Sequence, residues 1–385
     1  MQRLKREGEE LDDGCRPRLS ALSELLRRAR SLYPGGCLEL TETFPVFQHS
    51  ALVDVSHLQE RACYYPDAAG EPQLRQAIAD HLTRDLAMPR VEPASILVTQ
   101  GASHAIFTIA QTFQHRLPAL SFPVPSFAGY RQVARSLRIP MMEYPAPDEQ
   151  WNPRSAFSRH PTGALVFVNS PHNPTGYVLN IEQIREIFLV AAEHKLLLVF
   201  DVVYDAFIFQ TALGAAAPYV VAQEFPNVPA FFVNSLSKNM GCPGLRIGWI
   251  VAPSESIAMF EVGVEASVNC LSPVTQAIAR ELFLHWPRAK CLEVMRARLG
   301  RMIDQLGDSP QLQFQVPLGG TMLWVKSEEA TVMSLLNWLL EEHAILLLPG
   351  SAYSGGSDEY FRLSYGYPEA KIDLVCARIR DFFSR

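Results

Sequence analysis

The chain has 385 residues, of which 48% are hydrophobic and 19% are charged, and this length suits two domains better than one compact core. The formal net charge of -6 excludes the basic surface typical of a nucleic-acid-binding protein. No apolar run approaches the roughly 18 residues of a membrane span, and the scattered cysteines, without a CxxC pair, predict reduced thiols in a cytoplasmic protein.

The first elements predicted along the chain are two helices. In residues 18–33 the leucines share one helical stripe opposite several arginines, and a Pro-Gly-Gly sequence at 34–36 ends this helix. A second helix follows the Gly-Glu-Pro sequence at 70–72 and runs to about residue 86.

Short apolar runs then alternate with helix-length segments. Their hydrophobicity is continuous rather than alternating, which is typical of strands covered on both faces. We therefore predict an α/β architecture over about residues 50–265, with a mostly parallel central sheet covered by helices. The runs lie at 96–99, 164–169, 196–200, 231–234 and 248–251.

The pattern changes after about residue 275. Helical patterns at 274–286 and 291–306 lead to strand-like pieces near 313–316, 321–325 and 361–365, which predict a smaller α+β domain. The expected organisation is an N-terminal segment (1–48) that packs with the small domain, a large domain (49–270) and a small C-terminal domain (271–385).

Two segments place polar groups directly after predicted strands. Ala102 and Ser103 follow the first strand at the start of a helix, where free N–H groups favour an anion; a plain strand-to-helix turn is the alternative. In 168–179 two prolines fix a loop that carries Asn173, as expected if that amide must be held at one place. A structural turn is the alternative there.

Two further segments place charged groups in the same way. Asp201 follows five apolar residues, and a carboxylate there needs a cation or several donors; Tyr204 lies three residues on, and a helix-capping Asp is the alternative. Ser235, Ser237 and Lys238 follow the fourth strand, with Arg246 beyond a glycine-bearing loop. This set suits a phosphate plus a carbonyl, with a solvated lysine as the alternative.

These four segments, in this order, resemble the fold-type I enzymes that use pyridoxal 5'-phosphate (PLP), specifically the class I/II aminotransferase family. The resemblance runs from about residue 65 to residue 362 and includes the sequences SPHNPTG, DxxY, SxSK and GLRIGW. It implies the PLP-dependent transferase fold of the aspartate aminotransferase type.

The resemblance implies a role for each residue around the cofactor. Lys238 would form the Schiff base and later shuttle the proton, and Asp201 would pair with the protonated pyridine nitrogen. Asn173 and Tyr204 would donate to the ring hydroxyl oxygen, and Phe127 would stack on the ring. The phosphate would be held by Ala102, Ser103, Ser235 and Arg246, and secondarily by Ser237.

Two implied contacts lie outside this set. Arg362 would grip the α-carboxylate of the substrate, a task suited to a guanidinium, with an arginine on an edge strand as the alternative. Tyr65 would reach the phosphate of a neighbouring subunit, which implies a homodimer with shared active sites.

The chain departs from the family near its N-terminus. Relatives usually have glycines before a Pro-x-Phe sequence in a segment that passes close to the substrate, and this chain has Thr41, Glu42 and Thr43. An acidic side chain there predicts a basic amino acid as substrate. The alternative is that Glu42 points to solvent or pairs with a local arginine, and strand alternation would turn it away if both threonines faced the pocket.

The expected activity is amino transfer from an L-amino acid through an external aldimine formed at Lys238. The alternative is PLP-dependent elimination, replacement or cyclisation of an amino acid, such as the arginine-like substrate of capreomycidine-forming enzymes. A non-catalytic regulator is the third possibility, against which Lys238, Asp201 and Arg362 together argue. His104 and His172 are interpreted as structural, and no histidine has the spacing of a metal ligand.

Overall fold

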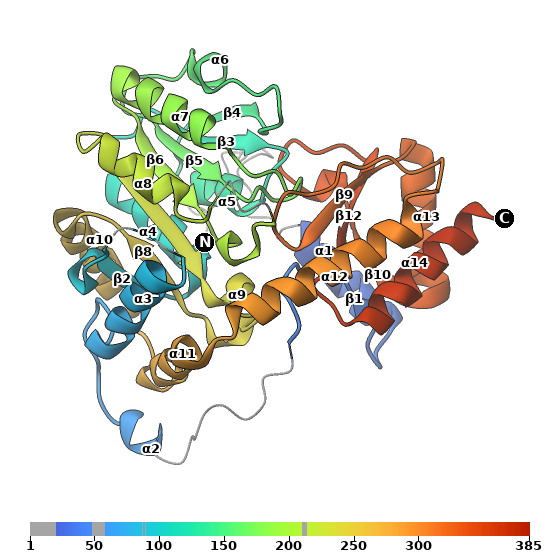
Figure 1. Cartoon of the computed structure of the whole chain (residues 1–385), viewed down its shortest axis with the longest axis horizontal. Coiled ribbons are helices and arrows are strands. Elements are labelled where there is room, and N and C mark those ends of the chain that lie inside the picture. Colours follow the sequence, from blue (N-terminus) through green and yellow to red (C-terminus); the bar gives the residue numbers. More distant parts are fainter. Residues whose placement is uncertain (1–20, 48–57, 87, 89, 210–213) are drawn as a thin grey trace, which may run out of the picture.

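A seven-stranded sheet forms the centre of the larger part of the molecule (Figure 1). The structure is a computed structural model that describes residues 21–47, 58–86, 88, 90–209 and 214–385. The sheet has the order β2-β8-β7-β6-β5-β3-β4; β8 runs antiparallel to β2 and β7, and the other neighbouring pairs are parallel. Its strands are β2 (Ile96–Thr99), β3 (Leu120–Val124), β4 (Met141–Pro145), β5 (Leu165–Asn169), β6 (Leu197–Asp201), β7 (Ala230–Ser235) and β8 (Gly248–Val251).

Helices cover both faces of this sheet, and two successive phenylalanines of β7 show how. Phe232 stacks with a tyrosine of α8 at 4.0 Å between ring centroids, whereas Phe231 packs against phenylalanines of α4 and α10. Successive side chains of a strand point to opposite faces, so α8 lies on one face and α4 and α10 lie on the other. The helices of this part are α2 (Leu58–Arg61), α3 (Pro72–Arg84), α4 (Gly101–Phe113), α5 (Gly129–Ser136), α6 (Pro153–Phe157), α7 (Ile181–His194), α8 (Ala217–Glu224), α9 (Leu236–Asn239), α10 (Ser254–Val268) and α11 (Pro273–His285).

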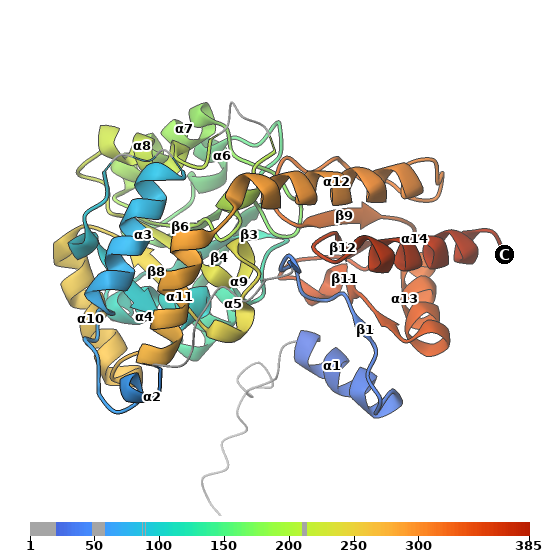
Figure 2. The same ribbon diagram turned by 60° about the horizontal axis from the view of Figure 1, so that its bottom comes forward.

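A second, smaller unit is built on the three-stranded antiparallel sheet β11-β12-β9. The long helix α12 runs from the large part toward this sheet and packs against α14 (Figure 2). The N-terminal segment joins this unit, because β1 pairs with β10 and Ala29 of α1 packs with Leu340 and Leu346. The elements are α1 (Ala21–Leu32), β1 (Leu38–Glu39), α12 (Arg288–Leu306), β9 (Met322–Lys326), α13 (Glu329–His343), β10 (Ile345–Leu346), β11 (Leu348–Pro349), β12 (Tyr360–Ser364) and α14 (Glu369–Phe383).

Each unit has its own hydrophobic core. The core of the large sheet extends along the chain to Phe283 of α11, which packs on α3. The core of the small sheet draws mainly on residues from Cys291 onward. The chain therefore passes from the first core to the second between α11 and α12. The sequence places the domain boundary at residue 271, and that boundary stays a prediction.

The predicted α/β class, with its mostly parallel sheet, is confirmed, and the five predicted strands are present within a residue at each end. In the large sheet, β3 and β4 were not predicted, and elsewhere the two-residue strands β1, β10 and β11 were not predicted either. In β4 most side chains are exposed or half-buried, so the strand shows no apolar run, and β3 contains Pro123. The strand predicted at 313–316 is wrong, because only a single bridge between Gln313 and Lys326 forms there. Within the described ranges, no helix combines the length and apolarity needed to span a bilayer.

Candidate active site

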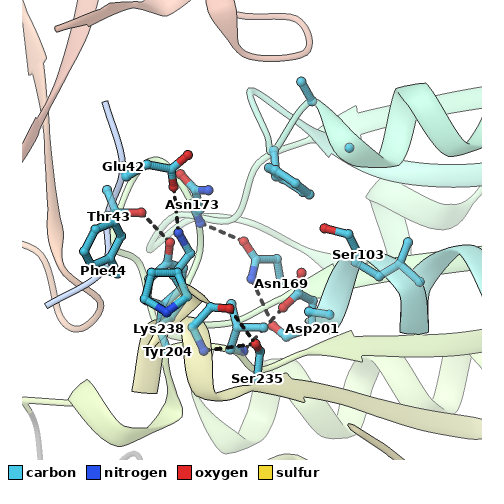
Figure 3. A pocket seen from close by; sticks show the side chains of 18 of the residues that line it. Glu42, Thr43, Phe44, Ser103, Asn169, Asn173, Asp201, Tyr204, Ser235 and Lys238 are labelled. Atoms are coloured by element: carbon cyan, nitrogen blue, oxygen red, sulfur yellow. Dashed lines mark hydrogen bonds and ion pairs between the residues drawn. The ribbon is translucent and has the colours of Figure 1, made fainter. Parts of the chain in front are cut away.

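A cavity of about 490 Å³ lies between the two sheets, at the carboxyl ends of the central parallel strands (Figure 3). Strands β5, β6 and β7 end at Asn169, Asp201 and Ser235, so the polar residues that follow each strand meet at one edge of the sheet. The predicted site residues that line the cavity are Thr41, Glu42, Ala102, Ser103, Phe127, Asn173, Asp201, Tyr204, Ser235, Ser237, Lys238, Arg246 and Arg362.

Lys238 reaches the cavity from the one-turn helix α9. Ser235 starts this helix, because its hydroxyl accepts the backbone N–H of Ser237 at 3.1 Å. Lys238 Nζ lies 3.1 Å from Glu42 Oε2 (Figure 3). The lysine is thus held in the cavity by a carboxylate and is not a solvated surface residue.

The side chain of Glu42 enters the cavity. Thr41, Glu42 and Thr43 all line the cavity, so Glu42 is not turned away from it by strand alternation. Its side chain keeps 46% of its surface exposed, and its ion-pair partner is Lys238 and not a local arginine. Strand β1 ends at Glu39, and residues 40–47 adopt no regular structure, so alternation does not apply to them. Burial by itself raises the pKa of Glu42, but the charge and hydrogen bond of Lys238, with two nearby arginines, hold this pKa below its usual value.

Asp201 is buried at the end of β6, with 4% of its surface exposed. Its Oδ2 accepts the hydroxyl of Tyr130 at 2.6 Å, and its Oδ1 accepts the N–H of Val203 at 3.3 Å. Burial raises the pKa of Asp201 to about 6, against the lowering effects of these donors and of Lys238. The residue caps no helix, so the helix-capping alternative is wrong.

Two further predicted residues are held by hydrogen bonds around the cavity. The hydroxyl of Tyr204 lies 2.5 Å from that of Thr43, which links the N-terminal segment to the large sheet. The N–H of Asn173 donates to Asn169 Oδ1 at 2.7 Å, and Asn169 Nδ2 donates to the carbonyl of Asp201 at 2.9 Å. The loop that carries Asn173 is therefore fixed to the end of β6.

The start of α4 forms a tight backbone cradle. Gly101 has a φ of +74°, which favours glycine, and a Cβ there would lie 2.6 Å from an Arg246 Nη atom, so the guanidinium would have to move. A Cβ on Gly248 would lie 2.5 Å from the carbonyl carbon of Gly101. Close approach of these backbones puts Ala102 and Ser103, in the first turn of α4, on the cavity wall, where the free N–H groups favour an anion.

Arg246 completes this cradle. It adopts a left-handed conformation, with φ of 52°, and donates to Ser237 Oγ at 3.3 Å and to the carbonyl of Gln100 at 3.4 Å. Ser235 Oγ donates to the carbonyl of Ile247 at 3.0 Å and lies 3.0 Å from Ser237 Oγ. The sequence analysis gave Ser237 only a secondary place among the phosphate contacts, and the structure shows that this serine is hydrogen-bonded to Arg246.

Arg362 enters the cavity from β12 and is 5% exposed. It donates to Asn173 Oδ1 at 2.9 Å and to the carbonyl of Thr41, and its guanidinium lies 5.1 Å from the ring centroid of Tyr353. Its Nε is buried without a partner, and among the described residues no carboxylate lies within 4.0 Å of it. A buried guanidinium of this kind favours an anionic ligand.

Two aromatic candidates differ in position. Phe127 lines the cavity and is 37% exposed. Tyr65 does not line it, and 84% of its surface is exposed. A single chain therefore does not bring Tyr65 into the site.

Several contributors escaped the sequence analysis. Tyr130, the buried partner of Asp201, lies three residues after Phe127. On a helix this spacing puts two side chains on the same face, so it could have indicated that Tyr130 also lies near the site. Tyr353 and Phe44 line the cavity without any motif. In the part of the chain that the structure describes, no cluster of three or more His, Cys, Asp or Glu side chains is arranged to hold a metal.

Comparisons with known proteins agree with this geometry. The family model for aminotransferase class I and II matches residues 43–379. An aspartate aminotransferase from Geobacillus stearothermophilus is 26% identical, over 93% of this chain and 98% of its own. The 3-methylarginine biosynthesis aminotransferase ArgM from Streptomyces arginensis is 29% identical, over 86% and 88% respectively.

The fold is also shared with solved structures. An aminotransferase from Mycobacterium tuberculosis superposes with a TM-score of 0.83 at 20% identity and covers 98% of this chain and all of its own. The family model spans most of the chain. The chain belongs to the class I and II aminotransferases.

Proposed function

We propose that this protein binds PLP at Lys238 and transfers the α-amino group of an L-amino acid to a keto acid. The family is PLP-dependent, and the proposal assigns the cofactor and its contacts to particular residues of this chain. One observation carries it: a single cavity contains a lysine, a buried carboxylate, an anion cradle and a buried arginine without a carboxylate partner.

The residues present fit PLP. The cradle of α4, Ser237 and Arg246 suits the phosphate, because N–H groups, a hydroxyl and a guanidinium converge there. The Asp201 carboxyl, with a pKa of about 6, is mostly ionised at neutral pH and suits a protonated ring nitrogen. When bound, PLP acts as an electron sink for the substrate's α-carbon.

The remaining work falls to side chains of this protein. Lys238 Nζ takes the proton from the α-carbon of the substrate, acting as the general base. Arg362 binds the α-carboxylate, with Asn173 and the carbonyl of Thr41 fixing the plane of its guanidinium. Tyr204 would donate to the ring hydroxyl oxygen of the cofactor, and its hydrogen bond with Thr43 orients its hydroxyl.

The names of the relatives favour transamination over the alternatives. Both relatives described above are named as aminotransferases, whereas elimination, replacement and cyclisation gain no better support. Their names point to different substrates, aspartate in one case and a step of 3-methylarginine biosynthesis in the other. The amino acid used by this chain must therefore be inferred from its own cavity.

We also propose a homodimer with shared active sites. The support is the exposure of Tyr65, which lies outside the cavity of its own chain and is free to reach a second one. Size measurement by sedimentation tests the dimer, and a monomer that retains full activity would contradict it. A cytoplasmic location stays a prediction from the sequence.

The test of the proposed function has two parts. Borohydride treatment of the PLP-loaded protein should fix the cofactor irreversibly, and peptide mapping should find it on Lys238. In a separate, unreduced sample, incubation with a panel of L-amino acids should give one keto acid for each cofactor converted to pyridoxamine phosphate. Label on another lysine would overturn the assignment, and release of ammonia without cofactor conversion would indicate elimination.

A further inference from the structure

Among the residues that line the cavity, the charged side chains are three cations and two carboxylates. The proposed function gives four of them a partner: Lys238 bonds to the cofactor, Arg246 faces its phosphate, Arg362 faces the α-carboxylate, and Asp201 faces the ring nitrogen. Glu42 is left over. In the resting protein Lys238 Nζ is bonded to PLP, and once the substrate amine has displaced it, its role as general base requires a neutral amine. In neither state does it offer Glu42 the ammonium found 3.1 Å away.

The backbone around Glu42 is fixed on both sides, so the carboxylate is presented at a defined place. Arg362 donates to the carbonyl of Thr41, and Thr321 Oγ1 donates to the carbonyl of Thr43 at 2.7 Å. The hydroxyl of Tyr367 donates to the carbonyl of Glu42 itself at 3.4 Å. The Glu42 side chain keeps 46% of its surface exposed, and it lines the cavity, so it is open to a ligand.

Two buried hydroxyls near Glu42 also call for a ligand. Thr41 Oγ1 and the hydroxyl of Tyr353 are buried with no hydrogen-bond partner among the residues that the structure describes, and both residues line the cavity. Thr41 is 1% exposed and Tyr353 is 6% exposed. Buried polar atoms that lack a partner are costly, and hydroxyl oxygens accept the N–H groups of ammonium and guanidinium ions.

The charge of Glu42 decides which ligand is favoured. Removing a carboxylate from water is costly unless a cation accompanies it. A substrate with an anionic side chain would be repelled by Glu42, and a neutral side chain would leave the carboxylate unpaired. A cationic side chain satisfies the carboxylate and the two hydroxyls together.

We infer that Glu42 selects an L-amino acid whose side chain carries a cationic nitrogen, as an ammonium or a guanidinium, with Thr41 and Tyr353 as further acceptors. This inference rests on the proposed function, because it takes Lys238, Arg246, Arg362 and Asp201 as already engaged. The substrate class is therefore that of ornithine, lysine and arginine.

The test measures binding rather than turnover. The PLP-loaded protein is titrated with α-methyl-L-ornithine and with α-methyl-L-norleucine, which have side chains of similar length and differ in charge. Neither has an α-hydrogen, so the absorbance change of the bound cofactor reports binding alone. The wild type should bind the ornithine analogue at least about 10-fold more tightly, the scale of one hydrogen bond to a charged group.

Two substitutions isolate the carboxylate. Glu42→Gln should bring the ratio of the two dissociation constants close to one, and Glu42→Asp should retain part of the preference. Glu39→Gln makes the same charge change at a residue outside the cavity and should keep the wild-type ratio.

The outcomes separate this inference from the proposed function. Equal affinities in the wild type, or a preference that survives Glu42→Gln, would overturn the inference alone. An equal loss for both analogues in Glu42→Gln would mean that Glu42 acts on Lys238 and not on the side chain, which also overturns it. A wild type that fails to hold PLP, or that converts no amino acid of the panel used to test the proposed function, would instead sink the proposed function.

Discussion

Replacing Arg362 by lysine separates the geometry of this residue from its charge. In the structure the guanidinium is 5% exposed, donates to Asn173 and to the carbonyl of Thr41, and lies against the ring of Tyr353. A lysine ammonium keeps the positive charge but is a single point donor, so it cannot hold these contacts and a bidentate carboxylate together. The substitution should therefore remove at least one charged hydrogen bond to the substrate.

One such bond contributes about 1.5–3 kcal/mol, which corresponds to a rise of about 10- to 150-fold in the dissociation constant. The assay is spectral titration of the PLP-loaded Arg362→Lys protein with several L-amino acids, all of which should lose affinity by a similar factor. The absorbance of the resting protein should stay normal, because Lys238 is untouched.

Two controls sharpen this experiment. An amine that lacks a carboxylate, such as n-propylamine, should bind the variant and the wild type equally. Arg301→Lys changes an arginine on the surface, paired with Asp373 between α12 and α14, and should leave every affinity unchanged. Unchanged amino-acid affinity in Arg362→Lys, or an equal loss for the amine, would refute the role of Arg362 in binding the α-carboxylate.

Three other substitutions test the cavity. Burial raises the pKa of Asp201 to about 6, so ionising this carboxyl destabilises the folded protein without cofactor. Asp201→Asn should therefore increase the free energy of unfolding, measured in urea, at pH 8 and hardly change it at pH 4. No increase at pH 8 would contradict this reasoning. Tyr130→Phe removes a donor that lowers this pKa, so PLP affinity measured by equilibrium dialysis should fall by about 10-fold or more at pH 6 and by less at pH 8; an equal loss at both would contradict it. Gly248→Ala places a Cβ against the backbone of Gly101 and should destabilise the protein by about 1–3 kcal/mol, whereas Gly300→Ala, in open space on α12, should stabilise it by about 0.5–1 kcal/mol.

Much of the candidate site was accessible from the sequence, for a physical reason. Parallel strands end at a common edge, so residues that follow each apolar run meet there. Asp201 and Lys238 each follow such a run, and the structure brings both to the cavity. The edge strand β4 was missed because exposed and half-buried side chains give no continuous apolar pattern.

Contacts between distant segments could not be predicted in this way. The hydrogen bond from Tyr130 to Asp201 joins α5 to β6 and depends on how two elements pack. The alternative in which Glu42 faces away from the cavity assumed strand alternation, which does not apply because residues 40–47 form no strand. Backbone pairing with β10 ends at Leu40, and the carbonyl of Thr43 is held instead by the side chain of Thr321, so the strand pattern does not continue through this segment.

The cavity concentrates groups that cost stability in the protein alone. Asp201 is buried with a raised pKa, Arg362 leaves its Nε without a partner, and the hydroxyls of Thr41 and Tyr353 are buried unpaired. Polar groups held in this way in one place are typical of a site organised in advance for a ligand.

Two hydrophobic cores, one on each sheet, hold these groups in fixed positions around the cavity. The N-terminal segment is the bridge between them, since Thr43 contacts Tyr204 of the large unit and Thr321 of the small one. The segment Thr41-Glu42-Thr43 therefore contributes both to the chemistry of the cavity, through Glu42, and to its anchoring, through Thr43.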